Sequence, residues 1–128
     1  KIKVFEKKPI AILFNKKKKF YLSEKIDLIE FKDLEEYKNL PYVFGDKDKF
    51  KILYQDLKKI DFPFNLIKNY MYFDSNRWDL KTINKRTIKL PNENYIKSLQ
   101  SYLEVYNKES FAKFTIFDYR MKDQLVLK

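Results

Sequence analysis

The sequence predicts an α+β domain with a largely antiparallel β-sheet and two main helices packed on one face. Strand-type and helix-type segments follow one another in the order strands, helix, strands, helix, strands. The 128 residues are 45% hydrophobic, which is enough for a single core. With one glycine, four prolines and no Gly/Ser linker, the chain reads as a single domain over residues 1–128.

The first third of the chain is expected to form a β-meander, because short alternating or apolar runs are separated by charged turns. The expected strands are residues 2–6, 10–14, 20–22 and 26–31, with Pro9 breaking the first from the second. Residues 15–19 read as a charged turn whose four lysines form a solvated hairpin tip. Residues 33–37 predict a loop or one helical turn.

The middle of the chain predicts a helix followed by strands. Asp46 can cap a helix that ends near Asp61 and buries one face. The apolar positions of that face are Phe50, Leu53, Tyr54, Leu57 and Ile60. Residues 66–73 then read as a strand, and residues 77–83 and 87–90 as a β-hairpin.

A second helix is expected to start at a cap formed by Asn92 or Asn94 and to run to about Tyr106. Its apolar positions recur at helical spacing, at Tyr95, Leu99, Tyr102, Leu103 and Tyr106.

Two β-runs close the sequence within residues 111–128, separated by a turn at Lys122 and Asp123. In the first run, Phe114, Ile116 and Asp118 alternate with Thr115, Phe117 and Tyr119. The second run is Leu125, Val126 and Leu127. A terminal strand with large apolar side chains is an edge with which another polypeptide can pair, so this segment points to partner binding rather than to chemistry.

The net charge of +10 allows two interpretations. One is a basic nucleic-acid-binding module, or a contact with an acidic membrane, and strand aromatics such as Tyr70 and Tyr72 could stack on bases. The other is the base composition of the genome, because only three of the 28 basic residues are arginine. Nucleic-acid sites usually rely on arginine, so the second interpretation is favoured.

Residues that would support catalysis are scarce. The chain has no histidine and no cysteine, and one glycine cannot build a phosphate-binding loop. We therefore expect no catalytic residue, no metal and no cofactor. The carboxylates at Glu35–Glu36 and at Asp46 and Asp48 are expected to be surface or capping groups.

Two arginine–aspartate pairs are candidates for structural or binding roles. Alternation places Trp78 in the core and leaves Arg77 and Asp79 on the opposite face, where a cross-strand ion pair is expected. Arg120 lies beside Asp118, and the residues alone leave open whether it forms a structural ion pair or an interface anchor.

Several short motifs, taken in order, resemble the extracytoplasmic β-domain of the bacterial cell-division protein family FtsQ/DivIB, most closely its alphaproteobacterial branch. They are Val4 and Glu6 with Pro9 and Ala11, Tyr21-Leu22, Leu40-Pro41 with Gly45, Arg77-Trp78 with Leu80, Ile88 with Pro91, and Asp118 with Arg120 before Gln124. In two family turns a glycine is replaced, by Ile26 and by Lys85, so these turns are expected to need another backbone solution.

The resemblance implies a non-enzymatic divisome scaffold that promotes septum formation. It implies a single-pass protein of the inner membrane, with this domain on the periplasmic side and with the POTRA domain, membrane helix and cytoplasmic tail outside this chain. FtsB-like proteins, and through them FtsL-like proteins, would bind by strand addition at the last strand. The expected partner-binding residues are Phe117, Tyr119, Arg120, Met121, Asp123, Leu125 and Leu127. The expected structural residues are Glu6, Pro9, Gly45, Arg77, Trp78, Pro91 and Asp118.

Overall fold

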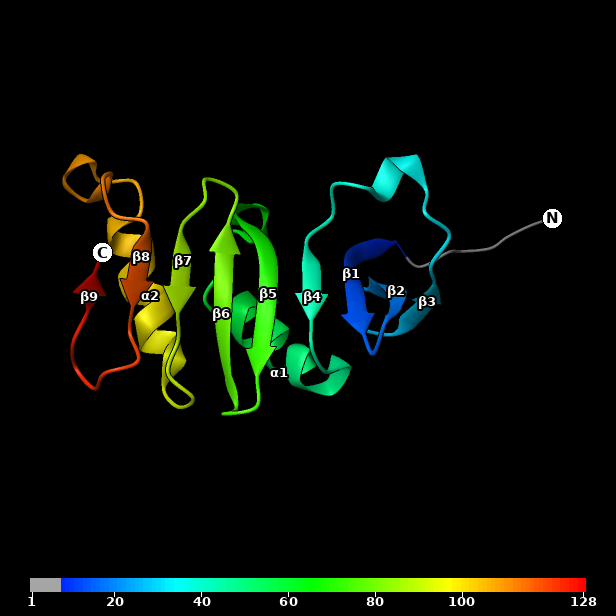
Figure 1. Ribbon diagram of the computed structural model, residues 1–128, viewed down its shortest axis with the longest axis horizontal. Helices are drawn as coiled ribbons and strands as arrows, with labels where there is room; N and C mark the ends of the chain where they lie inside the picture. Colours follow the sequence, from blue (N-terminus) through cyan, green and yellow to red (C-terminus); the bar gives the residue numbers. More distant parts are fainter. Residues whose placement is uncertain (1–7) are drawn as a thin grey trace.

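The computed structural model describes residues 8–128, which form one nine-stranded sheet with two helices (Figure 1). The strand predicted at residues 2–6, which includes Glu6, lies outside the described residues. The strands are β1 (Pro9–Asn15), β2 (Lys18–Ser23), β3 (Leu28–Glu30), β4 (Tyr42–Phe44), β5 (Ile67–Phe73), β6 (Arg77–Thr82), β7 (Thr87–Lys89), β8 (Ile116–Asp118) and β9 (Val126–Leu127). The helices are α1 (Lys47–Lys59) and α2 (Tyr95–Val105), with 3₁₀ turns η1 (Glu35–Tyr37), η2 (Phe64–Leu66) and η3 (Glu109–Phe111).

The strand order β3-β2-β1-β4-β5-β6-β7-β8-β9 confirms the α+β class. Neighbouring strands are antiparallel except at β1–β4, β4–β5 and β7–β8. The last two of these parallel pairs are the ones that α1 and α2 connect, because a parallel pair needs a crossover that returns the chain to the starting end. The sheet is therefore largely antiparallel, as the sequence predicts, and two of its three parallel pairs occur where the helices are inserted.

Both helices cover the same face of the sheet. Cross-strand pairing places one continuous row of side chains on that face: Leu13, Val43, Tyr70, Leu80, Ile88 and Phe117. The ring of Phe50 on α1 lies 5.0 Å from that of Tyr70, and the ring of Tyr102 on α2 lies 5.1 Å from that of Phe117. These contacts, and the helices drawn behind the strands in Figure 1, confirm the predicted one-sided arrangement.

The two helices begin differently. The side chain of Asp46 accepts hydrogen bonds from the backbone N–H groups of Asp48 and Lys49, so α1 has the predicted cap. Asn94 precedes α2 at the predicted position, but its side chain makes no capping hydrogen bond. Its backbone is left-handed, with φ of 58°, a conformation that asparagine tolerates well. The position of the second helix was thus predicted correctly, whereas its capping was not.

The turns keep left-handed backbone without glycine. Lys16 and Lys17 have φ of 50° and 68° and form a two-residue hairpin turn, so Lys18 and Lys19 belong to β2 and the turn is shorter than predicted. Ile26 and Lys85 have φ of 62° and 69°. The expectation that these two turns need another backbone solution is therefore wrong, because the backbone of both residues adopts the left-handed region that favours glycine.

Ile26 shows where the strain at such a position is compensated. Its side chain is buried in the core, and its backbone N–H donates to the carbonyl of Ser23. Because this turn takes up residues 23–27, the strand predicted from residue 26 begins only at Leu28.

Gly45 is required at the junction between β4 and α1. Its φ of 149° is unfavourable for other residues, and a Cβ at this position would lie 2.6 Å from Cβ of Tyr72. The glycine therefore allows β4 to approach β5 closely just before α1 begins.

Candidate partner-binding edge

The strand β9 forms one edge of the sheet in the part of the chain that the structure describes. It pairs only with β8, through Phe117 opposite Leu127 and Asp118 opposite Val126. Ile116 and Lys128 exchange both backbone hydrogen bonds, each 3.1 Å long. In an antiparallel pair such residues alternate with residues whose N–H and C=O groups point away, so those of Leu125 and Leu127 face outward.

Two of the predicted partner-binding side chains lie in the core. Phe117 is fully buried, and its ring contacts those of Tyr102 and Phe111. Tyr119 is also buried, and its hydroxyl accepts a hydrogen bond of 3.5 Å from Ser101. Burial raises the pKa of Tyr119 above its ordinary value. These two side chains support the edge from behind, and the exposed candidates are their neighbours.

Arg120 and Asp118 form a bidentate ion pair. Arg120 donates from Nε over 2.9 Å and from a terminal nitrogen over 2.6 Å to the two carboxylate oxygens, and its backbone N–H donates to the same group. These hydrogen bonds lower the pKa of Asp118 below its ordinary value. The structural alternative for Arg120 is therefore confirmed, while 43% of its side chain stays exposed for a further contact.

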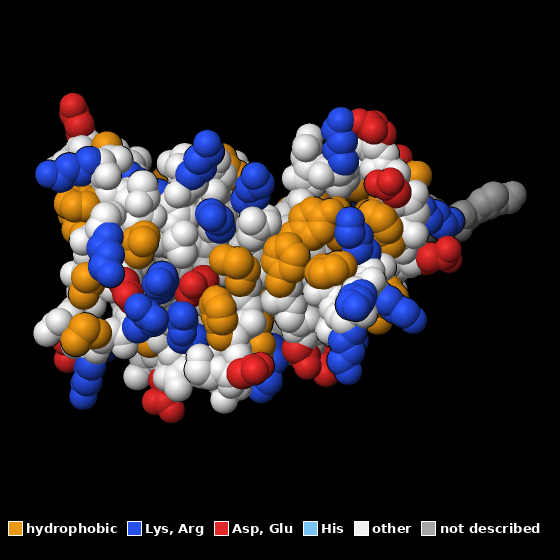
Figure 2. Space-filling view, in the orientation of Figure 1, with side chains coloured by type: hydrophobic (Ala, Val, Ile, Leu, Met, Phe, Trp, Pro, Cys, Tyr) orange, Lys and Arg blue, Asp and Glu red, His pale blue; other side chains and the backbone are white. Residues whose placement is uncertain are grey.

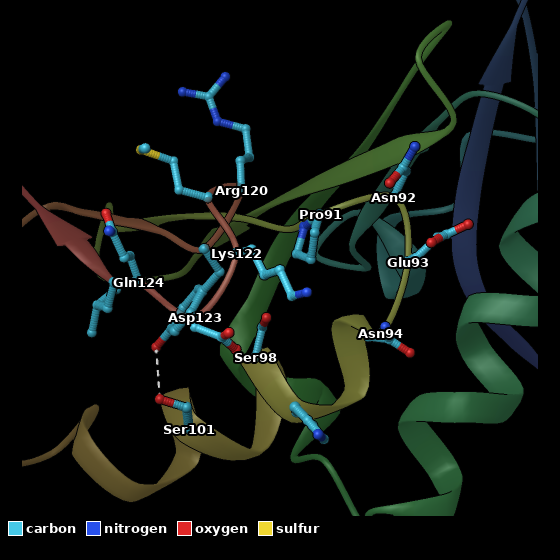
Figure 3. A pocket seen from close by; sticks show the side chains of 14 residues that line it. Pro91, Asn92, Glu93, Asn94, Ser98, Ser101, Arg120, Lys122, Asp123 and Gln124 are labelled. Atoms are coloured by element: carbon cyan, nitrogen blue, oxygen red, sulfur yellow. Dashed lines mark hydrogen bonds between the residues drawn. The ribbon is translucent and has the colours of Figure 1, made fainter.

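A hollow of about 660 Å³ lies between the loop that joins β8 to β9 and the start of α2. Pro91, Asn92 and Ser98 line one side, and residues 119–125 line the other. Figure 3 shows Arg120 pointing away from α2. Met121, which is 57% exposed, and Asp123 belong to the same loop.

The expected structural residues within 8–128 occupy defined positions. Trp78 is buried against Phe50 and Tyr72, which confirms its core role. Arg77 and Asp79 form an ion pair of 2.5 Å, but within strand β6, so the expectation of a cross-strand pair is wrong. Both side chains point to one face because residues two apart on a strand do so.

Arg86 is a supporting residue that sequence reasoning missed. It is buried, and it donates to the carbonyls of Tyr106 over 2.6 Å and Phe111 over 3.1 Å, with its guanidinium 5.0 Å from the Phe117 ring. It thereby ties the end of α2 and η3 to β7. The scarcity of arginine is the sequence feature that could have pointed to Arg86. In a chain so rich in lysine, an arginine marks a position where several hydrogen-bond donors are needed at once.

The described residues form no cluster of His, Cys, Asp or Glu suited to a metal ion. The candidate carboxylates have other roles, since Asp46 caps α1 and Glu35 pairs with Lys38. Over residues 8–128 there is also no helix with the length and apolar character needed to cross a bilayer.

The fold and this site define an α+β domain with an open strand edge, of a kind suited to binding other polypeptides. A family model described as "Cell division protein FtsQ/DivIB, C-terminal" matches residues 12–120, and the chain belongs to this family. Family membership supports a scaffold role in cell division. Met121, Asp123, Leu125 and Leu127 follow the matched range.

A solved structure has the same fold. It is the major extracytoplasmic domain of the trans isomer of the bacterial cell division protein DivIB from Geobacillus stearothermophilus, with a TM-score of 0.53 and 14% sequence identity. The match covers 84% of this chain and 97% of that chain. A search of the curated proteins finds no match.

Proposed function

We propose that this chain is the partner-binding domain of a non-enzymatic divisome scaffold. The intact protein is anchored in the inner membrane by a single helix and carries this domain on the periplasmic side. The domain binds FtsB-like proteins, and through them FtsL-like proteins, to promote septum formation. The FtsQ/DivIB family supports the role in cell division, and the extracytoplasmic domain of DivIB, which shares the fold, supports the location.

The observation that carries the proposal is the open side of β9. The outward backbone groups of Leu125 and Leu127 offer donors and acceptors to an added strand. The side chains of both leucines pack against the core, which holds this short strand in place while its outer side stays free.

Side chains beside the edge supply selectivity. The guanidinium of Arg120 is held in a fixed orientation by Asp118 and is still half exposed, so it can contact a carboxylate or carbonyl of the partner. Met121 adds an exposed and adaptable apolar surface, and Asp123 adds a charge at the end of the loop. Phe117 and Tyr119 keep the edge rigid from the core side.

Calorimetric titration with the extracytoplasmic segment of the FtsB-like protein from the same organism tests the proposal. Saturable binding is expected for the wild type. Leu127→Pro removes an outward N–H and should abolish binding, whereas Leu127→Ala at the same position keeps the N–H and should retain most of it. Arg120→Glu should weaken binding at least tenfold. Lys51→Glu makes the same charge change at an exposed residue of α1 and should leave binding unchanged.

Circular dichroism must show that each variant is folded. The proposal fails if folded Leu127→Pro and Arg120→Glu proteins bind as the wild type does. It also fails if the wild type binds neither the FtsB-like segment alone nor this segment together with its FtsL-like partner.

A further inference from the structure

The face of the sheet opposite the helices carries a group of aromatic rings, of which Phe44 is exposed and the others are partly exposed. Cross-strand pairing places Phe14, Phe44 and Met71 in one row on that face, with Tyr42 on the same strand as Phe44. Figure 2 shows hydrophobic side chains gathered over β1, β4 and β5 on this face. We call Phe14, Phe31, Tyr42, Phe44 and Met71 the aromatic patch.

The rings of the aromatic patch hold one another in place by direct contacts. Tyr42 and Phe44 are stacked with centroids 5.7 Å apart, and Phe14 meets Phe44 edge-on at 5.9 Å. Lys19 lies between Phe31 and Tyr42, with its Nζ 5.4 Å and 5.5 Å from the two ring centres, and it donates to the Tyr42 hydroxyl. The patch is thus a preformed surface.

The charge beside the aromatic patch is positive and unbalanced. Residues 16–19 form the lysine-rich hairpin next to it, since Lys19 pairs with Phe14 across the β1–β2 ladder. Over residues 8–128, no carboxylate forms an ion pair with these four lysines. The two buried carboxylates elsewhere on this face, Asp79 and Asp118, are already paired with arginines.

We infer that the aromatic patch is a second docking surface, which binds an acidic protein segment through aromatic or aliphatic anchor side chains. Aromatic residues and methionine are characteristic of the centres of protein interfaces, and the lysines match carboxylates that flank such anchors. Phe44 is 36% exposed and is packed between Tyr42 and Phe14, which suits a protein surface better than insertion into a bilayer.

This surface goes beyond the proposed function, because it is separate from the edge at β9. The strands β5 and β9 are four positions apart in the sheet, which at about 4.8 Å per strand is roughly 19 Å. One segment can therefore occupy the patch while another strand is added to the edge.

Selection from a random peptide library displayed on phage tests this inference on the 128-residue chain. Enriched peptides are expected to combine Phe, Trp, Tyr or Leu with several Asp or Glu residues. Fluorescence anisotropy should then show at least tenfold weaker binding of synthetic copies to Phe44→Ser and to Lys19→Glu than to the wild type. The matched control is Ile52→Ser on α1, where an isoleucine 55% exposed lies away from the patch.

The inference is overturned if selection yields no acidic consensus, or if the selected peptides bind folded Phe44→Ser and Lys19→Glu proteins as they bind the wild type. Two further probes distinguish other ligands. Co-sedimentation with phosphatidylglycerol vesicles, or binding of a poly-dT oligonucleotide, that is lost in Phe44→Ser would assign the patch to lipid or to nucleic acid and would also overturn it. Binding of the FtsB-like segment is expected to be unchanged in Phe44→Ser, so this result is independent of the proposed function.

Discussion

The domain has a single glycine, so left-handed backbone falls on other residue types, including lysine and isoleucine, which rarely adopt it. Nine non-glycine residues within 8–128 have positive φ, among them Lys16, Lys17, Ile26 and Lys85. For most residue types this conformation costs about 1–2 kcal/mol. The strain is compensated by the hairpins that the turns close and, at Ile26, by burial of the side chain.

Replacing Lys85 by glycine is expected to stabilise the domain by about 1 kcal/mol, because glycine adopts a φ of 69° without steric cost. Thermal unfolding should show a midpoint several degrees higher. The matched control is Lys108→Gly, at an exposed lysine with φ of −81°, where glycine should bring no gain. A lower midpoint for Lys85→Gly would contradict the strain at this turn.

The ion pair of Asp118 with Arg120 predicts a pH dependence of stability. The hydrogen bonds from Arg120 lower the pKa of Asp118 below its ordinary 3.8, so the unfolded chain binds the proton more tightly. The stabilisation is therefore complete above the unfolded pKa and is lost as the pH falls through the lowered value. Asp118→Asn should cost about 1 kcal/mol near neutral pH, and progressively less as the solution is acidified below about pH 4.

Urea unfolding at several pH values measures this difference. Arg120→Gln supplies the control, because without the guanidinium Asp118→Asn should have a smaller effect at every pH. If Asp118→Asn lowers the free energy of unfolding by the same amount at every pH, the lowered pKa of Asp118 is contradicted.

At the scale of the elements, a hydrogen bond joins the two helices. The hydroxyl of Tyr95 on α2 donates to Asp56 on α1. Burial, together with this bond, raises the pKa of Tyr95 above its ordinary value. This contact joins the two helices directly.

Tyr95→Phe is expected to destabilise the domain by about 1 kcal/mol, because it leaves the carboxylate of Asp56 without this donor. Denaturant unfolding measures the change. Tyr106→Phe is the control on the same side of α2, at a hydroxyl for which the structure describes no hydrogen bond. Equal effects of the two substitutions would show that the hydroxyl of Tyr95 contributes nothing particular.

The elements that the sequence predicts best are those whose signals are local. The helix α1 is fixed by Asp46 and by apolar residues at helical spacing, all within its own segment. The strand expected after Phe111 is shorter in the structure than predicted. The turn η3 and the hydrogen bond from Arg86 to the carbonyl of Phe111 hold the start of this segment in another conformation. Arg86 is distant in sequence, so a local pattern cannot report its effect.

The candidate edge was predictable in position but not in orientation. The terminal strand follows from its apolar run, and the pairing of Arg120 with Asp118 follows from their spacing. Alternation separates Phe117 from Ile116 but cannot say which of them faces the helices. That depends on α2, whose Tyr102 packs on Phe117.

At the scale of the whole molecule, the central strands are paired on both sides and carry a row of buried side chains. Val43, Tyr70, Leu80 and Ile88 lie side by side in one row and are almost fully buried. Amide hydrogen exchange should therefore be slowest in β4 to β7 and fastest at the edges β3 and β9.

Within β9 the exchange should also alternate. The amide of Lys128 donates to Ile116 and should be the better protected, while the outward amide of Leu127 should exchange rapidly. Adding the FtsB-like segment should slow Leu127 most. Strong protection of Leu127 in the free domain would mean that this edge is already occupied.

The shortness of β9 limits how tightly the domain can hold a partner through the backbone alone. Leu125 and Leu127 together present two donors and two acceptors, and at a net of about 1 kcal/mol each they supply roughly 4 kcal/mol, which corresponds to millimolar affinity. A partner strand held by these backbone hydrogen bonds alone dissociates readily. Confinement of both proteins to one membrane would raise their effective concentration, so avidity among several weak contacts can provide lasting attachment that still comes apart step by step.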